Sequence, residues 1–418
     1  LPNGNKLPQI SCFVVEKRWP GVQVVHTCRF MGLRGIANGT VAFKDVKVPA
    51  ENILWGEGKG LKLALITLNT GRLTIPASVA GASKALLRGV REWAAERVQW
   101  GQPIAKHDAI AQKIARLAAN TFAMESVAMM STALYERGGT DIRLEAAIAK
   151  MFNTELAWRS VDDALQIRGG RGYETADSLR ARGETPLPIE RAMRDSRINR
   201  IFEGSSEIMR LFIAREAVDE HFARAFPIVA PESSFGTRVK FALKAAPFYL
   251  TWYPGTWIRS FRSYGNFGPL QPHLRYLERT TRKLGRSLFH AMVRFGPKLE
   301  KRQMVLFRAV DIGAELYAMA STISRAKMLA EQGNAEAMEL ADRIVIMNEG
   351  VVAQEGTPEE IVASPSVPFV LNFLGHANAL HGVAKHGEAD VQGLRVPFPG
   401  ANGATVPVVG YVRPAHLS

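Results

Sequence analysis

The sequence contains only two cysteines, Cys12 and Cys28, with no CxxC spacing and no neighbouring pair of histidines. This scarcity excludes a disulfide framework and gives no support to a zinc site or to any other metal site. The sequence also lacks a run of 18 or more apolar residues, which excludes a membrane-spanning helix. We therefore expect a protein of a reducing compartment.

Acidic residues are scarce in one block of the chain. The net charge is +14, and residues 231–310 hold 15 lysines and arginines against three acidic residues. The same block is rich in aromatic residues, among them Phe241, Phe248, Tyr249, Trp252, Tyr253, Trp257 and Phe261. This mixture suits a membrane interface or an anionic groove, although a solvated basic domain with its aromatic residues in the core is the simpler explanation. Nucleic acid is not favoured as a partner, because no helix-turn-helix, zinc-finger or RNP signature accompanies the charge.

The periodicity of the apolar residues predicts strands followed by helices. Hydrophobic residues make up 47% of the chain and charged residues 22%, which is typical of a folded protein of two to four domains at this length. Short runs over residues 9–55, beginning with 12–16, predict β-strands. From residue 60 to 226 the period is helical and at least four helices fit, with a clear stripe at Ile110, Ile114, Leu117, Ala118 and Phe122.

Apolar residues at helical spacing return over residues 271–337, and this spacing changes again after residue 337. Residues 343–354 predict a hairpin, and residues 357–360 read as the start of a helix with Thr357 as the N-cap. Short strands are expected in the last forty residues.

Residues 200–210 contain the first candidate for chemistry. Glu203 precedes Gly204 and two serines that can begin an apolar helix. On local grounds the simpler interpretation is a helix N-terminus, with Glu203 opposing the helix dipole and a serine as the cap. The alternative is a catalytic base held in an apolar cleft, followed by a glycine that lets a substrate approach the backbone.

Two further motifs are compatible with a cofactor that carries phosphate. Residues 166–173 form a glycine-rich turn after a helix, where backbone N–H groups can face phosphate oxygens and Arg168 or Arg171 can add charge. This turn matches neither the Walker A loop nor the dinucleotide fingerprint. Residues 97–107, from Arg97 to His107, are on local grounds an ordinary connection between two helices.

In this order and spacing, the three motifs resemble the acyl-CoA dehydrogenase family, in particular its very-long-chain branch with an additional C-terminal helical domain. The resemblance covers residues 1 to about 337. It implies FAD as the cofactor, a fatty acyl-CoA as the substrate and an electron-transfer flavoprotein as the redox partner. It further implies a homodimer or homotetramer in the bacterial cytoplasm, with a peripheral contact at the inner membrane through residues 238–262.

The resemblance also implies roles for individual residues. Glu203 matches the glutamate that removes the α-proton of the acyl thioester while the flavin accepts the β-hydride. Gly204 matches the backbone that receives the thioester carbonyl, and Asn69 and Arg72 are implied on the substrate side. Some relatives carry the base just before this arginine, but Gly71 occupies that place here. The residues implied at FAD are Arg97, Gln99, His107, Gln166, Ile167, Arg168, Gly169, Gly170, Ser205 and Glu207, of which the 166–170 loop serves the pyrophosphate of a neighbouring subunit.

The last eighty residues resemble another family. Residues 337–350, 356–360 and 369–375 are similar to the C-terminal part of the ATPase subunit of a sulfate-type ABC importer, without that family's nucleotide-binding motifs. At the other end, the resemblance implies that the chain begins within the middle β domain and lacks half of the flavin site. We interpret the chain as a fusion of two fragments with impaired activity. A transport-related or regulatory role of the tail and a basic peripheral membrane module stay open as alternatives.

The expected fold is mainly α-helical, with a partial β domain, a four-helix-bundle domain, an appended helical domain and a small α/β tail. The expected boundaries are residues 1–57 for the second half of the middle β domain, 58–228 for the helical domain that holds FAD and acyl-CoA, 229–337 for the appended basic domain, 338–378 for the ABC ATPase fragment and 379–418 for the start of the ABC regulatory β domain.

Overall fold

The structure is a computed structural model that describes residues 9–139, 141–229, 233–258 and 262–333, together with six strands between residues 344 and 412. It is mainly helical, as the sequence predicts. The chain forms two compact units, Leu1–Asn266 with His273–Arg325 and Phe267–Pro272 with Ala326–Ser418. Each unit is described by itself.

Short antiparallel strands precede the helices. Strand β1 (Cys12–Phe13) pairs with β4 (Ile53–Leu54), and β2 (Val22–Thr27) pairs with β3 (Gly39–Phe43). These strands lie where the sequence predicts them, but the expected strand at residues 12–16 is only two residues long. Every residue of β3 is exposed. A two-stranded ladder of this kind has little stability of its own.

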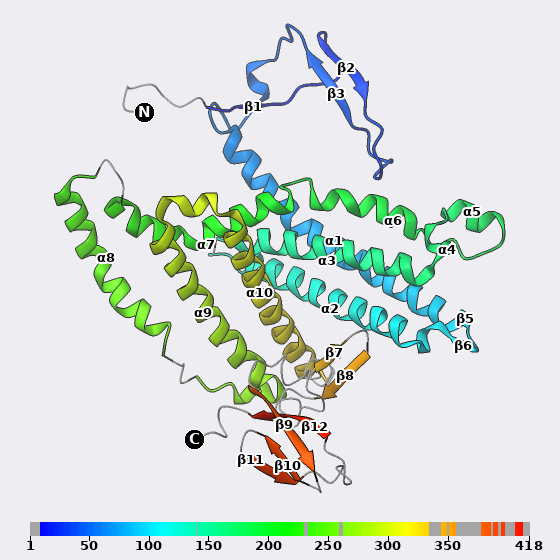
Figure 1. The fold of residues 1–418 in the computed structure, drawn as a ribbon. Helices are drawn as coiled ribbons and strands as arrows, with labels where there is room; N and C mark the ends of the chain where they lie inside the picture. The colour runs from blue at the N-terminus through cyan, green and yellow to red at the C-terminus, as the bar shows by residue number, and fades with distance from the viewer. Residues whose placement is uncertain are drawn as a thin grey trace. The chain divides into compact units, whose positions relative to one another are not determined.

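The helical part begins at Gly60, and its first three long helices pack side by side (Figure 1). A small hairpin of β5 (Val98–Gln99) and β6 (Gln102–Pro103) joins the first two of them. The helices are α1 (Gly60–Glu96), α2 (Asp108–Arg137), α3 (Arg143–Arg168), α4 (Gly170–Tyr173), α5 (Ala176–Ala181), α6 (Ile189–Ser196), α7 (Ser206–Val229), α8 (Phe235–Gly255), α9 (Gln271–Phe295) and α10 (Gln303–Glu331).

The predicted stripe on α2 forms part of the core. Leu117 is fully buried, and Ile110 and Ile114 pack against the same cluster as Val90 of α1 and Val161 of α3. The helical period in the sequence thus identified the buried face of α2 at Ile110, Ile114 and Leu117, whereas Ala118 of the predicted stripe is exposed.

Helix α3 is the central element of the bundle. Every residue from Ala146 to Thr154 is buried, because α1, α2 and α7 all pack against it. The Asn153 amide donates hydrogen bonds to the carbonyl oxygens of Pro76 in α1, at 3.1 Å, and of Met124 in α2, at 2.8 Å. This one polar side chain ties the three helices together.

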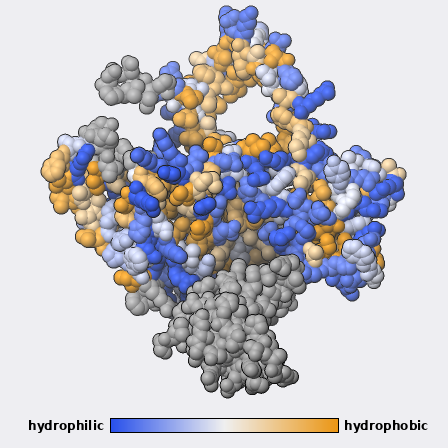
Figure 2. All heavy atoms as spheres, in the orientation of Figure 1, coloured by the Kyte–Doolittle hydropathy of each residue, from blue (hydrophilic) through white to orange (hydrophobic). Residues whose placement is uncertain are grey.

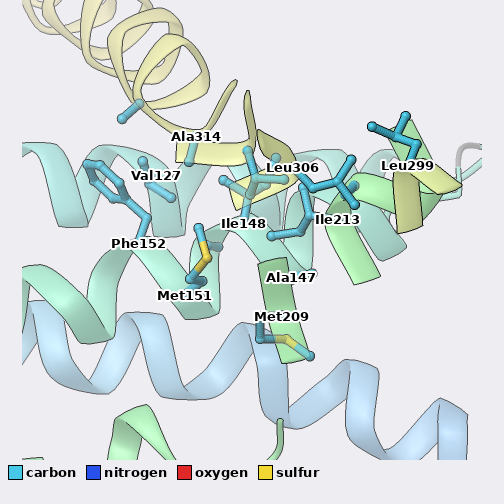
Figure 3. Close-up of a cluster of buried hydrophobic side chains, with 14 residues drawn as sticks. Val127, Ala147, Ile148, Met151, Phe152, Met209, Ile213, Leu299, Leu306 and Ala314 are labelled. Carbon is cyan, nitrogen blue, oxygen red and sulfur yellow. The ribbon is translucent and has the colours of Figure 1, made fainter. Parts of the chain in front are cut away.

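A second hydrophobic cluster joins α3 and α7 to α10 (Figure 3). It contains Ile148 from α3, Ile213 from α7, and Leu306 and Ala314 from α10. Residues on both sides of the boundary expected at 228/229 therefore share one core. The division into five domains stays a prediction.

Helix α8 is anchored on α7 by aromatic rings around His221. The imidazole ring lies 4.6 Å from the ring of Trp252 and 5.8 Å from those of Phe248 and Tyr249, measured between centroids. Burial lowers the pKa of His221, and Arg224 lowers it further, while Glu220 opposes both effects. The folded protein therefore favours the neutral imidazole.

We expect the contact between α7 and α8 to weaken in acid. Because the pKa of His221 is lower in the folded state, the stabilisation is complete above the ordinary pKa of about 6.5 and is lost as the pH falls through the lowered value. Amide hydrogen exchange in α8, corrected for its intrinsic pH dependence, should therefore accelerate between about pH 7 and pH 5. His221→Phe keeps a ring in the cluster and should remove this acceleration. The same pH dependence in both proteins would contradict the prediction.

The strands after residue 344 are all antiparallel. Strands β7 (Ile344–Asn348) and β8 (Val351–Gly356) pair with each other and confirm the predicted hairpin. The other four form a sheet in the order β11 (Leu394–Pro397), β10 (Glu388–Val391), β9 (Asn378–Lys385) and β12 (Val406–Val412). These are the short strands that the sequence predicts near the end of the chain. The helix start expected at residues 357–360 lies outside the described residues. Among the helices that the structure describes, none has the length and apolarity to cross a membrane.

Candidate functional site

Glu203 lies in a tight turn between two helical segments. Its φ is 52° and that of Gly204 is 99°, so a residue with a side chain occupies the left-handed region, at a cost of about 1–3 kcal/mol. At Gly204 a Cβ atom would come within 2.4 Å of Cε of Met209. The turn thus needs glycine at 204 and holds Glu203 in a strained conformation.

The Glu203 carboxylate lies against the backbone of α1. A Cβ atom added to Gly71 would be 2.1 Å from Oε2 of Glu203 and 2.8 Å from Oε1. The carboxylate therefore fills the space that a side chain at position 71 would need. Its Oε2 atom is buried and has no hydrogen-bond partner among the described residues. Such an oxygen is free to accept a proton from a bound molecule.

The helix end after this turn is capped by a serine. Helix α7 starts at Ser206, and Oγ of Ser205 accepts the N–H of Ile208 at 3.4 Å. Glu207 in the first turn is exposed, and its pKa is lowered by a hydrogen bond from its own backbone N–H and by the Ser205 side chain. Capping by a serine is thus present without the carboxylate of Glu203.

Arg72 places a buried cation beside this carboxylate. It follows Gly71 on α1, and its guanidinium lies 5.0 Å from the ring centre of Phe212. Burial lowers the pKa of Arg72, and the charge of Glu203 acts in the opposite direction. The predicted residues Arg72, Glu203, Gly204, Ser205 and Glu207 therefore gather at one end of the bundle. The side chain of Asn69 lies outside the described part of the chain.

Lys150 belongs to the same group of residues, although the sequence analysis did not identify it. It is fully buried on α3, and its Nζ atom donates a hydrogen bond to the carbonyl oxygen of Gly204 at 2.8 Å. Burial lowers its pKa to about 8. A signal was available, because Lys150 is the one charged residue within the apolar run 146–152. A helix that is apolar on all sides is buried, and so is a lysine within it.

A second polar contact from α3 holds the other side of the turn. Oε1 of Glu155 accepts hydrogen bonds from Nε of Arg200 at 2.9 Å and from Oγ of Ser206 at 2.5 Å. These two donors lie just before and just after Glu203 in the chain. The turn is therefore attached to α3 at both ends.

The predicted residues Arg97, Gln99 and His107 lie at the β5–β6 hairpin. This hairpin corrects the local expectation of a plain loop between helices, since strands of two residues leave almost no pattern in a sequence. Nε2 of His107 lies 3.0 Å from the carbonyl oxygen of Gln99, and its Nδ1 lies 3.1 Å from Nε2 of Gln102. Both ring nitrogens are therefore engaged within the hairpin.

The glycine-rich turn at the end of α3 has the features of an anion site. Gly169 has a φ of 61°, and nothing lies within 4 Å of a Cβ atom built at Gly169 or Gly170. Arg168 is buried, burial lowers its pKa, and its Nε atom has no hydrogen-bond partner among the described residues. An open backbone beside a buried guanidinium fits a diphosphate group. Gln166 is exposed, whereas Ile167 is in the core and offers only its backbone.

Trp93 connects this turn to the hairpin. The guanidinium carbons of Arg168, Arg171 and Arg97 lie 4.6, 5.7 and 5.9 Å from its ring centres. The structure therefore brings two of the predicted cofactor segments together. Arg171 is also paired with Glu184, at 2.7 Å, which leaves Arg168 as the better candidate for an added anion.

A model of the acyl-CoA dehydrogenase C-terminal domain matches residues 58–218, which include every residue of both groups. Over these residues the chain is similar to the acyl-CoA dehydrogenase family. A relative from Mycobacterium tuberculosis, "Probable acyl-CoA dehydrogenase FadE10", is 49% identical over 321 residues, which are 76% of this chain and 49% of the relative. The chain thus spans about half the length of this curated relative.

A second curated relative and a solved structure are also acyl-CoA dehydrogenases by name. The bovine "Very long-chain specific acyl-CoA dehydrogenase, mitochondrial" is 39% identical over 206 residues, which are 49% of this chain and 30% of the relative. A crystal structure of an acyl-CoA dehydrogenase complexed with FAD, from Bacillus anthracis, aligns with a TM-score of 0.62 and 27% identity over 79% of this chain and 55% of that chain. The resemblance of residues 338–418 to an ABC importer subunit is not tested by these matches and stays a prediction.

Within residues 58–218 the two groups of residues lie far apart. Lys150 contacts the turn of Glu203, whereas Arg168 is 18 positions further along the same helix. At 1.5 Å per residue, α3 separates them by roughly 27 Å. One chain therefore does not bring all the predicted site residues to a single place.

Proposed function

We propose that the chain supplies the base and the substrate side of an FAD-dependent dehydrogenation that converts a long-chain fatty acyl-CoA into the trans-2-enoyl-CoA. The observation that carries this proposal is the buried, unpartnered Oε2 atom of Glu203, held against Gly71 by a strained turn. A buried carboxylate oxygen without a hydrogen-bond donor is suited to proton abstraction.

In this proposal the turn binds the thioester and removes one proton. The backbone at Gly204 receives the thioester carbonyl, which makes the α-proton more acidic, and Glu203 takes that proton. FAD, when bound, supplies the acceptor for the β-hydrogen, which leaves as a hydride. One C–H bond breaks at each carbon and the double bond forms between them. Asn69 and Arg72 are proposed to line the substrate, and Ser205 and Glu207 to face the cofactor.

The proposed cofactor site uses two copies of the chain. Arg97, Gln99, His107 and residues 166–170, with Arg168 as the cation, would hold FAD, and the open backbone at Gly169 and Gly170 supports this assignment. The separation of roughly 27 Å along α3 supports the idea that the 166–170 turn serves the flavin of a neighbouring subunit in a homodimer or homotetramer. An electron-transfer flavoprotein is proposed to reoxidise the flavin.

The experiment uses a fusion protein that contains the half of the mycobacterial relative that this chain does not span. The N-terminal half of the mycobacterial relative is placed before residue 1, and the purified protein is loaded with FAD. Anaerobic mixing with a long-chain acyl-CoA should bleach the flavin and yield the enoyl-CoA, whereas the free fatty acid should not. A flavin that stays oxidised while acyl-CoA is bound would contradict the proposal.

A specific observation favours a second, peripheral role for α8. Its exposed apolar residues Phe235, Val239, Leu243 and Leu250 lie on one face of the helix, and Leu243 and Leu250 are 71% and 74% exposed. Hydrophobic residues gather at the left edge of the molecule, over α8 (Figure 2). Exposed Lys240 and Lys244 lie along one side of this face. Apolar residues beside cations suit insertion into an anionic membrane surface.

We expect the full chain to sediment with vesicles that contain acidic lipid and to lose this binding at high salt, because each cation near such a surface contributes about 1 kcal/mol. Replacing Leu243 and Leu250 together by serine should weaken the binding about tenfold or more, since two exposed leucines lose their contact with the acyl region. Val293→Ser removes an equally exposed residue, at 71%, from α9 and should leave binding unchanged. Equal sedimentation with neutral vesicles would contradict the electrostatic part of the proposal.

The fusion of residues 338–418 to the dehydrogenase part is likewise proposed from the resemblance of the tail. An intact mass of the expressed protein, or a sequencing read across residues 330–350, tests whether the two parts occur in one chain.

A further inference from the structure

We propose that Lys150 is a positioning residue for Glu203: its buried ammonium group holds the Gly204 carbonyl and so fixes the direction in which the Glu203 carboxylate leaves the turn. This inference rests on the proposed role of Glu203 as the base. Lys150 touches neither substrate nor cofactor in this proposal and acts through the turn alone.

The direct partner of Lys150 is unusual. Lysine is almost never fully buried unless a carboxylate pairs with it, yet no described residue forms an ion pair with Lys150. Its hydrogen bond goes to the carbonyl oxygen of Gly204, at 2.8 Å. One hydrogen bond to a backbone carbonyl offsets little of the desolvation free energy of a buried ammonium group. The contact is therefore better explained by what it does to the turn than by what it adds to stability.

The turn has a conformation that needs such a contact. Glu203 and Gly204 both have positive φ, and a strained backbone persists only where its surroundings determine it. Lys150 binds the middle of the turn, while Glu155, about one helical turn further along α3, binds Arg200 and Ser206 on either side. Contacts from one rigid helix thus hold the turn from which the Glu203 side chain extends toward Gly71.

The charge of Lys150 is also coupled to the site. The charged groups that act on it are Glu203 in the turn, Arg72 on α1 and Glu155 on α3 itself. Burial is the largest effect and lowers its pKa to about 8, Glu203 and Glu155 raise it, and Arg72 lowers it. The negative charge of Glu203 thus favours the charged form of Lys150.

The first test uses the chain without cofactor or substrate. Lysine labelled with ¹³C at Cε is titrated by NMR, and the signal absent from Lys150→Met is assigned to Lys150. We expect it to titrate near pH 8, well below the other lysines. Glu203→Gln should move this titration to still lower pH, because it removes a negative charge that raises the pKa. Glu207→Gln, at an exposed position in the first turn of α7, is the control and should not move it.

If Lys150→Met does not fold, Lys150→Arg keeps the charge and gives the same assignment, because it also removes the labelled lysine. The comparison of the wild-type chain with Glu203→Gln, which both keep Lys150, then decides the matter. A Lys150 signal that titrates with the ordinary lysines, or one that is indifferent to Glu203→Gln, would overturn the inference.

The second test measures the reaction in the FAD-loaded protein completed with the N-terminal half of the mycobacterial relative. Lys150→Met should slow flavin reduction about 10- to 100-fold, because a small displacement of a reacting group costs up to about 100-fold, while acyl-CoA binding changes little. The loss should therefore appear in kcat rather than in KM, which a general loss of stability would not produce. Lys84→Met, which removes an exposed lysine paired with Glu125 at 2.7 Å, should match the wild type.

The two tests separate this inference from the proposed function. An unchanged rate of flavin reduction in Lys150→Met, with Glu203→Gln inactive, would overturn the positioning role and keep the base. An active Glu203→Gln would instead remove Glu203 from the reaction and with it the positioning role of Lys150, while the titration would still report the electrostatic effect of Glu203 on Lys150.

Discussion

Glutamine in place of Glu203 should slow reduction of the bound flavin by a long-chain acyl-CoA about 100- to 10,000-fold, the usual effect of losing a general base. The substitution keeps the size and polarity of the side chain, and FAD and acyl-CoA should bind as before. Stopped-flow absorbance under anaerobic conditions measures the rate, in the protein completed with the N-terminal half of the mycobacterial relative.

The alternative role of Glu203, as a charge at a helix N-terminus, predicts a different result. Removing such a charge lowers the free energy of unfolding by about 0.3–1 kcal/mol and leaves the rate per folded molecule unchanged. Glu207→Gln is the matched control for stability, because it changes the same end of α7 without touching the carboxylate at Gly71. Its rate of flavin reduction is not used, because Glu207 is itself proposed to face the cofactor. Equal flavin reduction in wild type and Glu203→Gln would exclude Glu203 as the base.

Gly71→Ala should affect stability and activity in opposite directions. Alanine stabilises a helix relative to glycine by about 1 kcal/mol, but its Cβ atom would lie 2.1 Å from Oε2 of Glu203. The flexible carboxylate can move aside, so the fold should tolerate the change. The base would then be displaced by an ångström or more, and we expect flavin reduction to fall about 100-fold.

A second glycine on the same helix provides the control for this experiment. Gly81 also lies within α1, and nothing lies within 4 Å of a Cβ atom built there. Gly81→Ala should therefore give a similar gain in urea midpoint with an unchanged rate of flavin reduction. A Gly71→Ala protein as active as Gly81→Ala would show that the carboxylate does not depend on the space at position 71.

Much of the helical part could be predicted from the sequence. The stripe at Ile110, Ile114 and Leu117 identified the face of α2 that packs on α1 and α3, because helical spacing of apolar residues reports burial directly. Two serines before an apolar run predicted the start of α7, and Ser205 does cap it. Both features depend on residues that are close together in the sequence, so a local sequence pattern predicts them.

The geometry around the carboxylate could not be predicted in the same way. Nothing in a sequence places residue 203 over residue 71, or the ammonium group of Lys150 under the carbonyl of Gly204. Those contacts depend on how α1, α3 and the turn pack, and each joins residues more than fifty positions apart. The hairpin at residues 98–103 was missed for another reason, since its ladders are two residues long.

The length of α3 has a genetic consequence. In the proposed oligomer each flavin takes its base from one chain and its diphosphate-binding turn from another, because the two lie roughly 27 Å apart along this helix. A chain with Glu203→Gln then lacks the base, and a chain with Arg168→Ala lacks the cation of the diphosphate-binding turn. The two defects affect different parts of the site. A dimer of either variant alone contains two damaged sites. A mixed dimer contains one site with both defects and one with neither, so two inactive alleles expressed together should restore up to half of the activity per mixed dimer.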